Sequence, residues 1–346
     1  MSATLDDPSG RVKRPPTIID VAAHAGVSKS VVSRVMRDDP AVSPARREAV
    51  LAAAEALGYR PNAVARSLVQ RRTFNVGVIV SDLHNLFFAE ILDGIDAAAA
   101  KAGYKVLIIS GRLHQSNEER ALETLLQLRT DGIILAGSLL SAAAVRAASR
   151  SVPVAMVTSG IVVPGVDAVA TDDVKGAGLA VEHLASLGHW RIAMVDGGDG
   201  AGAAQRRNGY ASTMHQLGIG DYVQVAQGDY TEDGGWRGTR RLLEQKPRPT
   251  AICVANDLAA IGALNAIAER GLEVPRDVSV VGYDNTALAG LRHVSLTSVH
   301  QPRFEIGEMA MTAVLRRVGR PAARAKRELL EPHLVIRQTT GPAAPA

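Results

Sequence analysis

A lysine, several serines and an arginine follow a glycine near the start of the chain, in the stretch GVSKSVVSRV that begins at Gly26. Ammonium and guanidinium groups bind phosphate, and an arginine can also hold the O6 and N7 atoms of guanine with two hydrogen bonds. On a helical wheel of about 100° per residue, Ser30 and Arg34 point away from the valines, and Lys29 and Ser33 flank them. One polar face suited to nucleic acid is therefore expected here.

Valines and alanines predict the helices that carry this face. Val21 and Ala22 lie at helix spacing before the glycine, and Val32 and Val35 resume the pattern after it. Ser28 would cap the second helix, since its hydroxyl can accept from the amides two or three residues later. A third helix is expected in SPARREAVLAAAEALGY, with a serine at its N-cap, a proline in its first turn and a glycine at its end.

These helices predict a helix-turn-helix, a motif that sets its second helix in the major groove of DNA. Lys29, Ser30 and Arg34 would then meet base edges, and Ser28 would hold a phosphate. Val31 cannot donate a hydrogen bond, so a thymine methyl group is its expected partner on DNA. An ordinary helical hairpin with a charged outer face is the alternative interpretation.

The distribution of charge supports a nucleic-acid-binding segment at the N-terminus. Residues 1–73 contain 12 lysines and arginines against 7 acidic residues, whereas the remaining 273 residues contain 27 basic and 28 acidic side chains. All of the net positive charge therefore lies in the first fifth of the chain, as expected for a basic head on a near-neutral body. A solvated basic tail would give the same count.

The rest of the chain has the rhythm of an α/β protein. From Phe74 onward, short apolar runs such as VGVIV, DGIILAG, TAICVAND and VSVVGYD alternate with alanine- and leucine-rich stretches of helical length. About twice as many strands are expected as one open sheet normally uses, which favours two similar lobes. The predicted fold class is thus multidomain, with an all-α head and a core of two doubly wound parallel sheets.

Composition excludes several classes of protein. Apolar residues make up 47% and charged residues 21%, so neither a disordered nor a fibrous chain is indicated. Cys253 is the one cysteine, so no disulfide can form within the chain, and its expected role is that of a small buried hydrophobe. No secretion signal, membrane span or zinc-ligand spacing is recognised, and we expect a cytoplasmic protein associated with the nucleoid, with no metal and no cofactor.

Several stretches taken together carry a family resemblance. TIIDVAAHAGVSKSVVSRVM, VSPARREAVLAAAEALGYRPNAVARSL, VGVIVSDLHNLFFAEILDGI, VEHLASLGHWRIAMV, CVANDLAAIGAL and VPRDVSVVGYDN resemble, in this order, the landmarks of the LacI/GalR family of bacterial transcription regulators. The match extends from about Pro16 to Gly341. The resemblance implies a homodimeric repressor that binds an inverted-repeat operator, with a core shaped like the periplasmic sugar-binding proteins.

The resemblance also implies a division of the chain into segments. They are a flexible arm at 1–14, a helix-turn-helix domain at 15–61, a hinge helix or linker at 62–73, an effector-binding and dimerisation core at 74–341 and a tail at 342–346. The core would comprise an N-lobe of about 74–170 plus 300–329 and a C-lobe of about 171–299 plus 330–341. No leucine heptads follow the core, so a dimer is expected and not a tetramer.

For DNA, the resemblance adds a second set of contacts from the hinge. Asn62, Ala65, Arg66 and Leu68 would contact the operator, with Leu68 wedged into the minor groove at a central CpG step. The full set of expected DNA-binding residues is Ser28, Lys29, Ser30, Val31, Ser33, Arg34, Asn62, Ala65, Arg66 and Leu68.

For the effector, the resemblance implies a cleft formed by residues that follow the strands of the core. The expected residues are Asp82, Asn85, Phe87, Arg112, Thr158, Arg206, Tyr230, Asn256 and Asp284. Carboxylates and amides bind sugar hydroxyls, and aromatic rings stack on sugar rings. Because two arginines are included, a sugar acid or a phosphosugar is as compatible as a neutral sugar.

Two other classes of protein remain as alternatives. Gly198, Gly200 and Ala203 satisfy the dinucleotide-binding pattern G-x-G-x-x-A, and Asp221 follows at about the spacing that an NAD-dependent dehydrogenase needs. No acid/base pair accompanies the pattern, so no enzymatic role is predicted. A periplasmic-type sugar-binding protein would share the core but would have a signal peptide and no basic head.

Overall fold

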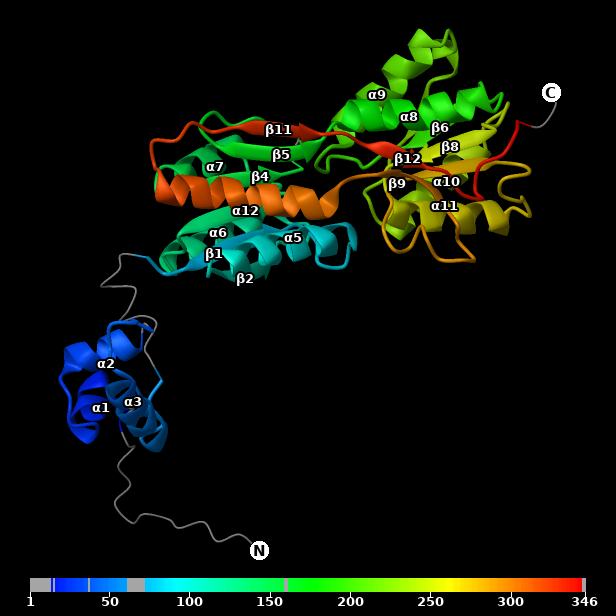
Figure 1. Ribbon diagram of the computed structural model, residues 1–346. Helices are drawn as coiled ribbons and strands as arrows, with labels where there is room; N and C mark the ends of the chain where they lie inside the picture. Colours follow the sequence, from blue (N-terminus) through cyan, green and yellow to red (C-terminus); the bar gives the residue numbers. More distant parts are fainter. Residues whose placement is uncertain (1–13, 15, 37, 61–71, 159–160, 344–346) are drawn as a thin grey trace, which may run out of the picture. The chain divides into compact units, whose positions relative to one another are not determined.

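Three short helices form the head of the computed structural model, and α/β lobes form its core (Figure 1). The chain divides into two units at Thr73 and Phe74. The structure describes residues 14, 16–36, 38–60, 72–158 and 161–343. The helices of the head are α1 (Ile18–His24), α2 (Lys29–Val35) and α3 (Pro44–Ala56).

Side chains at the helix starts stabilise the head. Thr17 and Asp20 form a capping box on α1, in which each side chain accepts from the backbone amide of the other. The Ser28 hydroxyl accepts from the amide of Val31 at the start of α2, as predicted. Ser43 occupies the N-cap position of α3 without a side-chain hydrogen bond, so its predicted position is correct but its side chain does not cap the helix.

A small apolar core confirms the predicted helix-turn-helix. Val21, Val32 and Val50, one from each helix, are fully buried against one another. Gly26 has a φ of +64°, which a side chain would strain, and this allows the tight turn between α1 and α2. The packing uses the inner face of α2 and leaves its outer face in solvent.

The first sheet of the core contains six parallel strands. Their order is β11 (Arg327–Leu330), β5 (Asp167–Thr171), β4 (Val154–Val157), β3 (Gly132–Ala136), β1 (Asn75–Val80) and β2 (Lys105–Ser110). Helices α5 (Phe87–Lys101) and α12 (Arg303–Gly319) cover one face, and α6 (Gln115–Gln127) and α7 (Ala142–Ser149) cover the other. Both faces of the sheet are therefore buried, which explains the continuous apolar runs of its strands.

The second sheet repeats this architecture. Its order is β12 (His333–Val335), β10 (Thr297–His300), β9 (Ser279–Asp284), β8 (Ala251–Val254), β6 (Ile192–Val195) and β7 (Gln224–Ala226). Helices α10 (Glu232–Leu243) and α11 (Asp257–Glu269) cover one face, and α8 (Asp173–Ser186) and α9 (Ala203–Gln216) cover the other, with the short 3-10 helix η1 (Gly220–Tyr222) after α9. One detail departs from the all-parallel expectation, because β12 returns antiparallel to β10.

The chain passes between the two sheets after β5, β10 and β11 (Figure 1). Because the sheets belong to different lobes, these crossings join the lobes side by side and bring strand ends of both toward one crevice. Among the described residues, no helix is long and apolar enough to cross a membrane. The same described residues hold no cluster of three metal-ligating side chains.

Candidate functional site

The outer face of α2 carries the side chains predicted to contact DNA. Lys29 and Ser30 are exposed in the first turn of the helix, and Ser33 and Arg34 are half-buried farther along it. The Arg34 side chain is 43% exposed, and its Nε donates to Asp39 Oδ2 over 2.9 Å. The helix therefore presents donors to solvent on the face that the sequence predicted.

Val31, which we expected to contact a thymine methyl group, is only partly available to DNA. It is half-buried and packs against the apolar cluster of the head. Part of the Val31 side chain therefore packs inside the head, and the rest is exposed on α2. The predicted hinge contacts of Asn62, Ala65, Arg66 and Leu68 lie outside the described residues.

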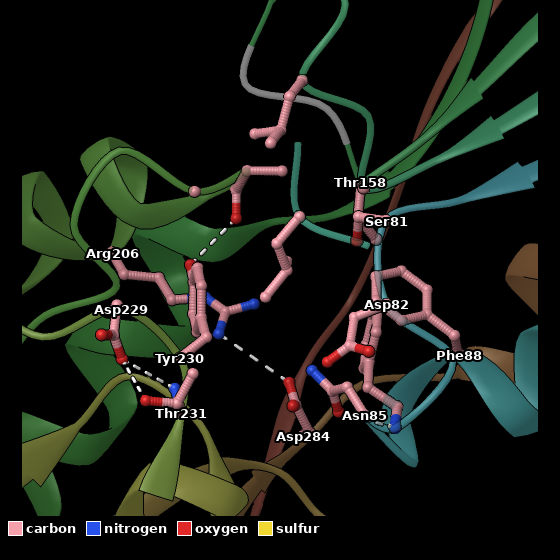
Figure 2. Close-up of a pocket in the computed structure, with 16 residues that line it drawn as sticks. Ser81, Asp82, Asn85, Phe88, Thr158, Arg206, Asp229, Tyr230, Thr231 and Asp284 are labelled. Carbon is pink, nitrogen blue, oxygen red and sulfur yellow. Dashed lines mark hydrogen bonds and ion pairs between the residues drawn. The ribbon is translucent and has the colours of Figure 1, made fainter. Parts of the chain in front are cut away.

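A pocket lies in the core where strands of both sheets end. The volume of the pocket is about 630 Å³, including the solvent at its open mouth. Among the described residues, those that line it are Ser81, Asp82, Asn85, Phe87, Phe88, Leu113, Gly137, Leu139, Thr158, Gly200, Ala201, Arg206, Asp229, Tyr230, Thr231 and Asp284. Figure 2 shows Ser81, Asp82 and Thr158 on one side and Arg206, Tyr230 and Asp284 on the other. Ligand sites of open α/β sheets form at such carboxyl ends of strands.

The structure brings together seven of the nine residues predicted for this cleft. They are Asp82, Asn85, Phe87, Thr158, Arg206, Tyr230 and Asp284. Arg112 does not line the pocket, but lines a separate surface hollow with Asn117 and Arg120. Its φ of +52° places it in a left-handed turn after β2. The two arginines expected in the cleft are thus reduced to one.

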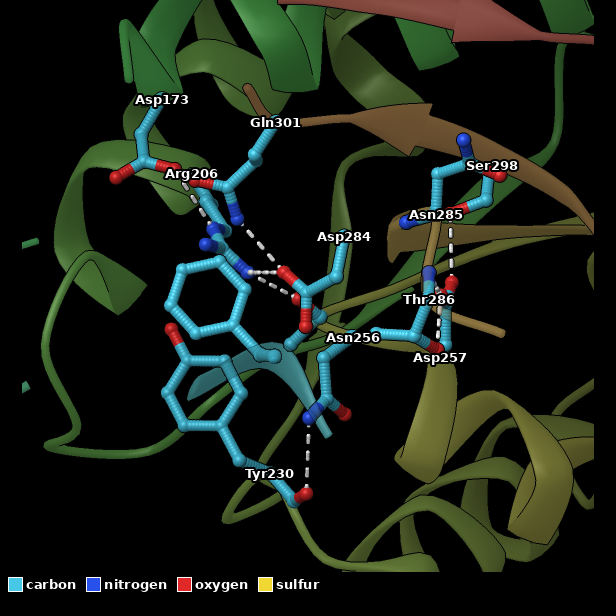
Figure 3. Close-up of polar contacts among 12 residues, drawn as sticks. Asp173, Arg206, Tyr230, Asn256, Asp257, Asp284, Asn285, Thr286, Ser298 and Gln301 are labelled. Atoms are coloured by element: carbon cyan, nitrogen blue, oxygen red, sulfur yellow. Dashed lines mark hydrogen bonds and ion pairs between the residues drawn. The ribbon is translucent and has the colours of Figure 1, made fainter. Parts of the chain in front are cut away.

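Asn256 is the other predicted residue that does not line the pocket. Its Oδ1 accepts from the amide of Ala259 at the start of α11, and its Nδ2 donates to the carbonyl of Tyr230. Asn256 is buried and supports Tyr230 from behind, as Figure 3 shows. Asn256 therefore caps α11, a position at which asparagine is common.

Sequence reasoning missed further side chains of the lining. Ser81 precedes the predicted Asp82, Phe88 follows Phe87, and Asp229 and Thr231 flank Tyr230. The resemblance indicated which segments reach the crevice, but it did not indicate every side chain of those segments that points into it. Phe87 and Phe88 meet edge to face, with ring centroids 5.1 Å apart, so both rings shape one wall.

Arg206 is the best-connected charge in the pocket. Its side chain is 6% exposed, and its Nε donates to Asp173 Oδ1 over 2.9 Å. Its Nη1 donates to the carbonyl of Ala255 and lies 3.8 Å from Asp284 Oδ1. The guanidinium also lies 3.8 Å from the centre of the Tyr283 ring. A buried cation is stable here because the Asp173 carboxylate pairs with it, and the Ala255 carbonyl and the Tyr283 ring contact it as well.

Asp284 ends β9 and lies next to Arg206, as Figure 3 shows. It is 3% exposed, and its Oδ1 accepts from Gln301 Nε2 over 2.7 Å. Burial raises the pKa of Asp284 to about 8, although Arg206 opposes the shift, and the nearby carboxylate of Asp257 adds to it. This carboxyl group can therefore donate or accept a hydrogen bond near neutral pH.

The Asp257 carboxylate holds the loop that follows Asp284. Its Oδ2 accepts from both the amide and the hydroxyl of Thr286, and its Oδ1 accepts from the hydroxyl of Ser298. Burial raises the pKa of Asp257 to about 6, and these hydrogen bonds oppose the shift. The position of Asp284 is thus fixed by a buried network behind it (Figure 3).

The glycine-rich loop after β6 makes room for an aromatic ring. A Cβ atom on Gly197 would lie 2.2 Å from Tyr230 Cζ, and one on Gly200 would lie 2.5 Å from its Cε2. The Tyr230 hydroxyl donates to the carbonyl of Ala201 in the same loop, and burial raises its pKa to about 12. Gly200 of the pattern G-x-G-x-x-A and the preceding Gly197 therefore leave room for Tyr230 at the edge of the pocket (Figure 2).

Backbone strain accompanies the polar lining. Thr158, Tyr230 and Asp284 have φ values of +49°, +65° and +101°, in a region that residues with side chains rarely adopt. Each such residue costs about 1–3 kcal/mol and persists because surrounding contacts hold it. Leu113, with a φ of +57°, also lines the pocket, and four such residues at one pocket indicate a site kept for binding.

Known protein families match both the head and the core of this chain. The family described as "Bacterial regulatory proteins, lacI family" matches residues 17–62, and the "Periplasmic binding protein-like domain" matches residues 181–340. The catabolite control protein A of Priestia megaterium is 36% identical over 330 residues, which cover 94% of this chain and 99% of that protein.

Solved structures extend the agreement to the fold. The lac repressor dimer bound to operator and the anti-inducer ONPF superimposes with a TM-score of 0.85 at 32% identity, covering 95% of this chain and all of that one. The complex of the transcriptional regulator CelR with cellobiose has a TM-score of 0.71 at 32% identity, covering 94% of this chain and 99% of that one. Similarity over nearly the whole length of these proteins shows that the chain belongs to the LacI family of bacterial regulatory proteins.

Proposed function

We propose that this chain is a transcriptional repressor that binds an inverted-repeat operator as a homodimer and changes its affinity when a small molecule occupies the pocket of the core. The observation that carries the proposal is the pocket itself, where seven predicted residues from both lobes meet in a chain that also has a helix-turn-helix. The lac repressor dimer of similar fold is bound to operator and an anti-inducer. We infer repression, and not activation, from the similarity to the lac repressor.

On the DNA side, the outer face of α2 supplies the contacts. Lys29, Ser30 and Arg34 contact base edges. Ser28, Val31 and Ser33 lie next to them on the same helix and complete the DNA-binding surface. Residues 62–73 act as the hinge, in which Asn62, Ala65, Arg66 and Leu68 contact the centre of the operator, a CpG step. The chain acts in the cytoplasm, associated with the nucleoid, and needs no cofactor.

On the ligand side, the lining favours a neutral polyhydroxylated ring. Arg206 is the one cation among the described lining residues, and Asp173 already compensates it. Of the acidic lining residues, Asp229 pairs with Arg237 and Asp284 has a pKa raised to about 8, so Asp82 supplies the carboxylate without a basic lysine or arginine partner. An added phosphate or carboxylate would lie near the Asp82 carboxylate and would find no uncompensated cation among these described residues. Sugar acids and phosphosugars are therefore weaker candidates than neutral sugars, a preference that the sequence left open. In the similar CelR complex, the ligand is cellobiose.

The two other classes of protein lose their basis. The glycine loop that suggested a dinucleotide site makes room for the Tyr230 ring. The family to which the chain belongs consists of regulatory proteins and not of enzymes. A periplasmic-type sugar-binding protein would not carry the DNA-binding head that the LacI family model covers at residues 17–62.

Selection from random double-stranded DNA tests the DNA-binding half of the proposal. The purified full chain should enrich an inverted repeat with a central CpG, and mobility-shift titration should show at least about 10³-fold tighter binding to it than to unrelated DNA. Enrichment of no palindrome would overturn the proposed function.

A thermal-shift screen tests the ligand-binding half. Neutral sugars and nucleosides should include a compound that stabilises the chain, whereas sugar acids and phosphosugars should give smaller shifts. A ligand at 100 times its dissociation constant adds about 2.7 kcal/mol to the free energy of unfolding. The Asp284→Ala variant should lose the shift of the best compound. A shift that survives this substitution would remove the pocket from the proposal.

A further inference from the structure

One acidic side chain lies beside the predicted base-reading arginine. Asp39 Oδ2 accepts from Arg34 Nε over 2.9 Å, and among the described residues no other carboxylate pairs with Arg34. Both side chains remain partly exposed, at 43% for Arg34 and 33% for Asp39. The pair therefore lies at the surface that the proposed operator contact uses, and not in the core of the head.

Asp39 is itself held in place by its backbone and by its second carboxylate oxygen. Its amide donates to the carbonyl of Arg34 over 3.1 Å, and its own carbonyl accepts from Arg47 Nη2 over 2.7 Å. Its Oδ1 accepts from the amide of Ala41 over 2.9 Å. Pro40 follows and restricts the backbone of Asp39 further. The carboxylate is thus fixed relative to α2.

This arrangement decides which nitrogens of Arg34 can reach a base. An arginine holds guanine through two parallel hydrogen bonds to O6 and N7. Because Asp39 occupies Nε, the two terminal nitrogens of Arg34 form the pair that remains for such a contact. A free arginine would have to lose much of its rotamer freedom on binding, whereas a side chain already held by a fixed carboxylate loses less.

We propose that Asp39 is a positioning residue that orients Arg34 for recognition of one base in each half-site. The inference rests on the proposed function, since it concerns how the DNA contact is made specific. A carboxylate near phosphates lowers the affinity for all DNA, so its expected contribution is to discrimination between sequences and not to overall binding. As an exposed ion pair, it adds little to the stability of the head.

Asp38 provides a matched control. It carries the same charge one position earlier, it is 92% exposed, and it pairs with Arg47 instead of Arg34. Its φ is +58°, a conformation that asparagine tolerates. The substitutions Asp38→Asn and Asp39→Asn therefore change the net charge equally, and only the second removes the partner of Arg34.

The test measures a specificity ratio with the full chain and the operator recovered by selection. The dissociation constant is determined for that operator and for a version in which the guanine pair contacted by Arg34 is replaced in each half-site. Asp39→Asn should lower the ratio of the two constants by roughly 2- to 12-fold, the cost of ordering one long side chain. Asp38→Asn should leave the ratio unchanged. Both variants should bind unrelated DNA slightly more tightly than the wild type.

A double-mutant cycle separates positioning from other effects. In an Arg34→Ala background, Asp39→Asn should cause no further loss of discrimination, because no side chain remains for Asp39 to orient. A further loss in that background would overturn the assignment, as would equal ratios for Asp39→Asn and Asp38→Asn. Thermal unfolding of each variant confirms that the head is folded. If the wild type selects no palindrome, the proposed function fails first and this assignment fails with it.

Discussion

Arg34 in the head and Arg206 in the core have the same side chain in opposite environments. Arg34 lies on a helix surface, 43% exposed, with one carboxylate partner. Arg206 is 6% exposed and is surrounded by Asp173, Asp284, the carbonyl of Ala255 and the Tyr283 ring. The guanidinium of Arg34 is open to a further partner from solvent, whereas that of Arg206 already donates to a carboxylate and a carbonyl inside the core.

The difference reflects what each surface would bind. DNA is a polyanion outside the molecule, so the head keeps its cations exposed and reads bases with donors that the fold does not need. A small ligand must be enclosed, so the core buries its polar groups and compensates them before the ligand arrives. Stability and recognition are therefore separable in the head and are coupled in the core. The four predictions below test this contrast.

Salt should distinguish the two regions most strongly. A protein that contacts 6–10 phosphates loses about 10³- to 10⁵-fold in affinity between 50 and 200 mM salt, because bound counterions are released. The pocket should hold a neutral ligand with nearly constant affinity over the same range. Fluorescence anisotropy with labelled operator and calorimetry with the best ligand measure the two dependences. A parallel fall of both affinities would contradict the contrast.

Removal of Arg206 should destabilise the core severely. Arg206→Ala leaves the Asp173 carboxylate buried without its cation, which costs about 3–5 kcal/mol. Urea unfolding should show this loss. Arg146→Ala is the control, since Arg146 is exposed on α7 and should change the free energy of unfolding by less than about 0.5 kcal/mol. Similar values for the two variants would mean that the network around Arg206 adds no stability.

Removal of Arg34 should weaken DNA recognition and leave the stability of the head nearly unchanged. Arg34→Ala should reduce discrimination at one base in each half-site by about 1–3 kcal/mol, while the free energy of unfolding of the head changes by less than about 1 kcal/mol. Competition titrations with single-base operator variants measure the first quantity. Uniform weakening on every DNA sequence would show that Arg34 contacts a phosphate and not a base.

The free energy of unfolding should depend on pH through the Asp284 carboxyl group of the pocket. Because the pKa of Asp284 is raised from 3.8 to about 8, the folded chain binds this proton more tightly than the unfolded chain does. Stability should therefore fall as the pH rises from about 4 to about 8, by at most about 1.4 kcal/mol per pH unit for one group. The difference in unfolding free energy between wild type and Asp284→Asn isolates this contribution. A difference that does not vary with pH would place the titration elsewhere.

The sequence predicted elements and segments better than side-chain directions. Apolar periodicity and glycine turns were sufficient for the helix-turn-helix and the alternating strands, because burial alone imposes those patterns. Predicted residues such as Asp82, Thr158 and Asp284 reach the pocket because strand ends must face the crevice. Arg112 is also at a strand end, but a left-handed turn directs it to another hollow, and no periodic pattern reports such a turn.

Two further features depend on contacts that sequence spacing does not reveal. Asp39 reaches Arg34 because of the bend around Asp38, which has a positive φ. Tyr230 fits its place because Gly197 and Gly200 leave space for its ring, although Gly200 also belongs to the dinucleotide pattern. In both cases the residue types were visible, and the backbone path that brings them together was not.

The measurement that tests the account most directly is operator affinity with and without the pocket ligand, for the wild type and for Asp284→Ala. Coupling between the sites should change the operator affinity of the wild type by at least about 5-fold at saturating ligand. Asp284→Ala should bind operator as the free wild type does and should not respond to the ligand. An operator affinity that stays the same for the wild type at saturating ligand would contradict a pocket that controls the DNA-binding head.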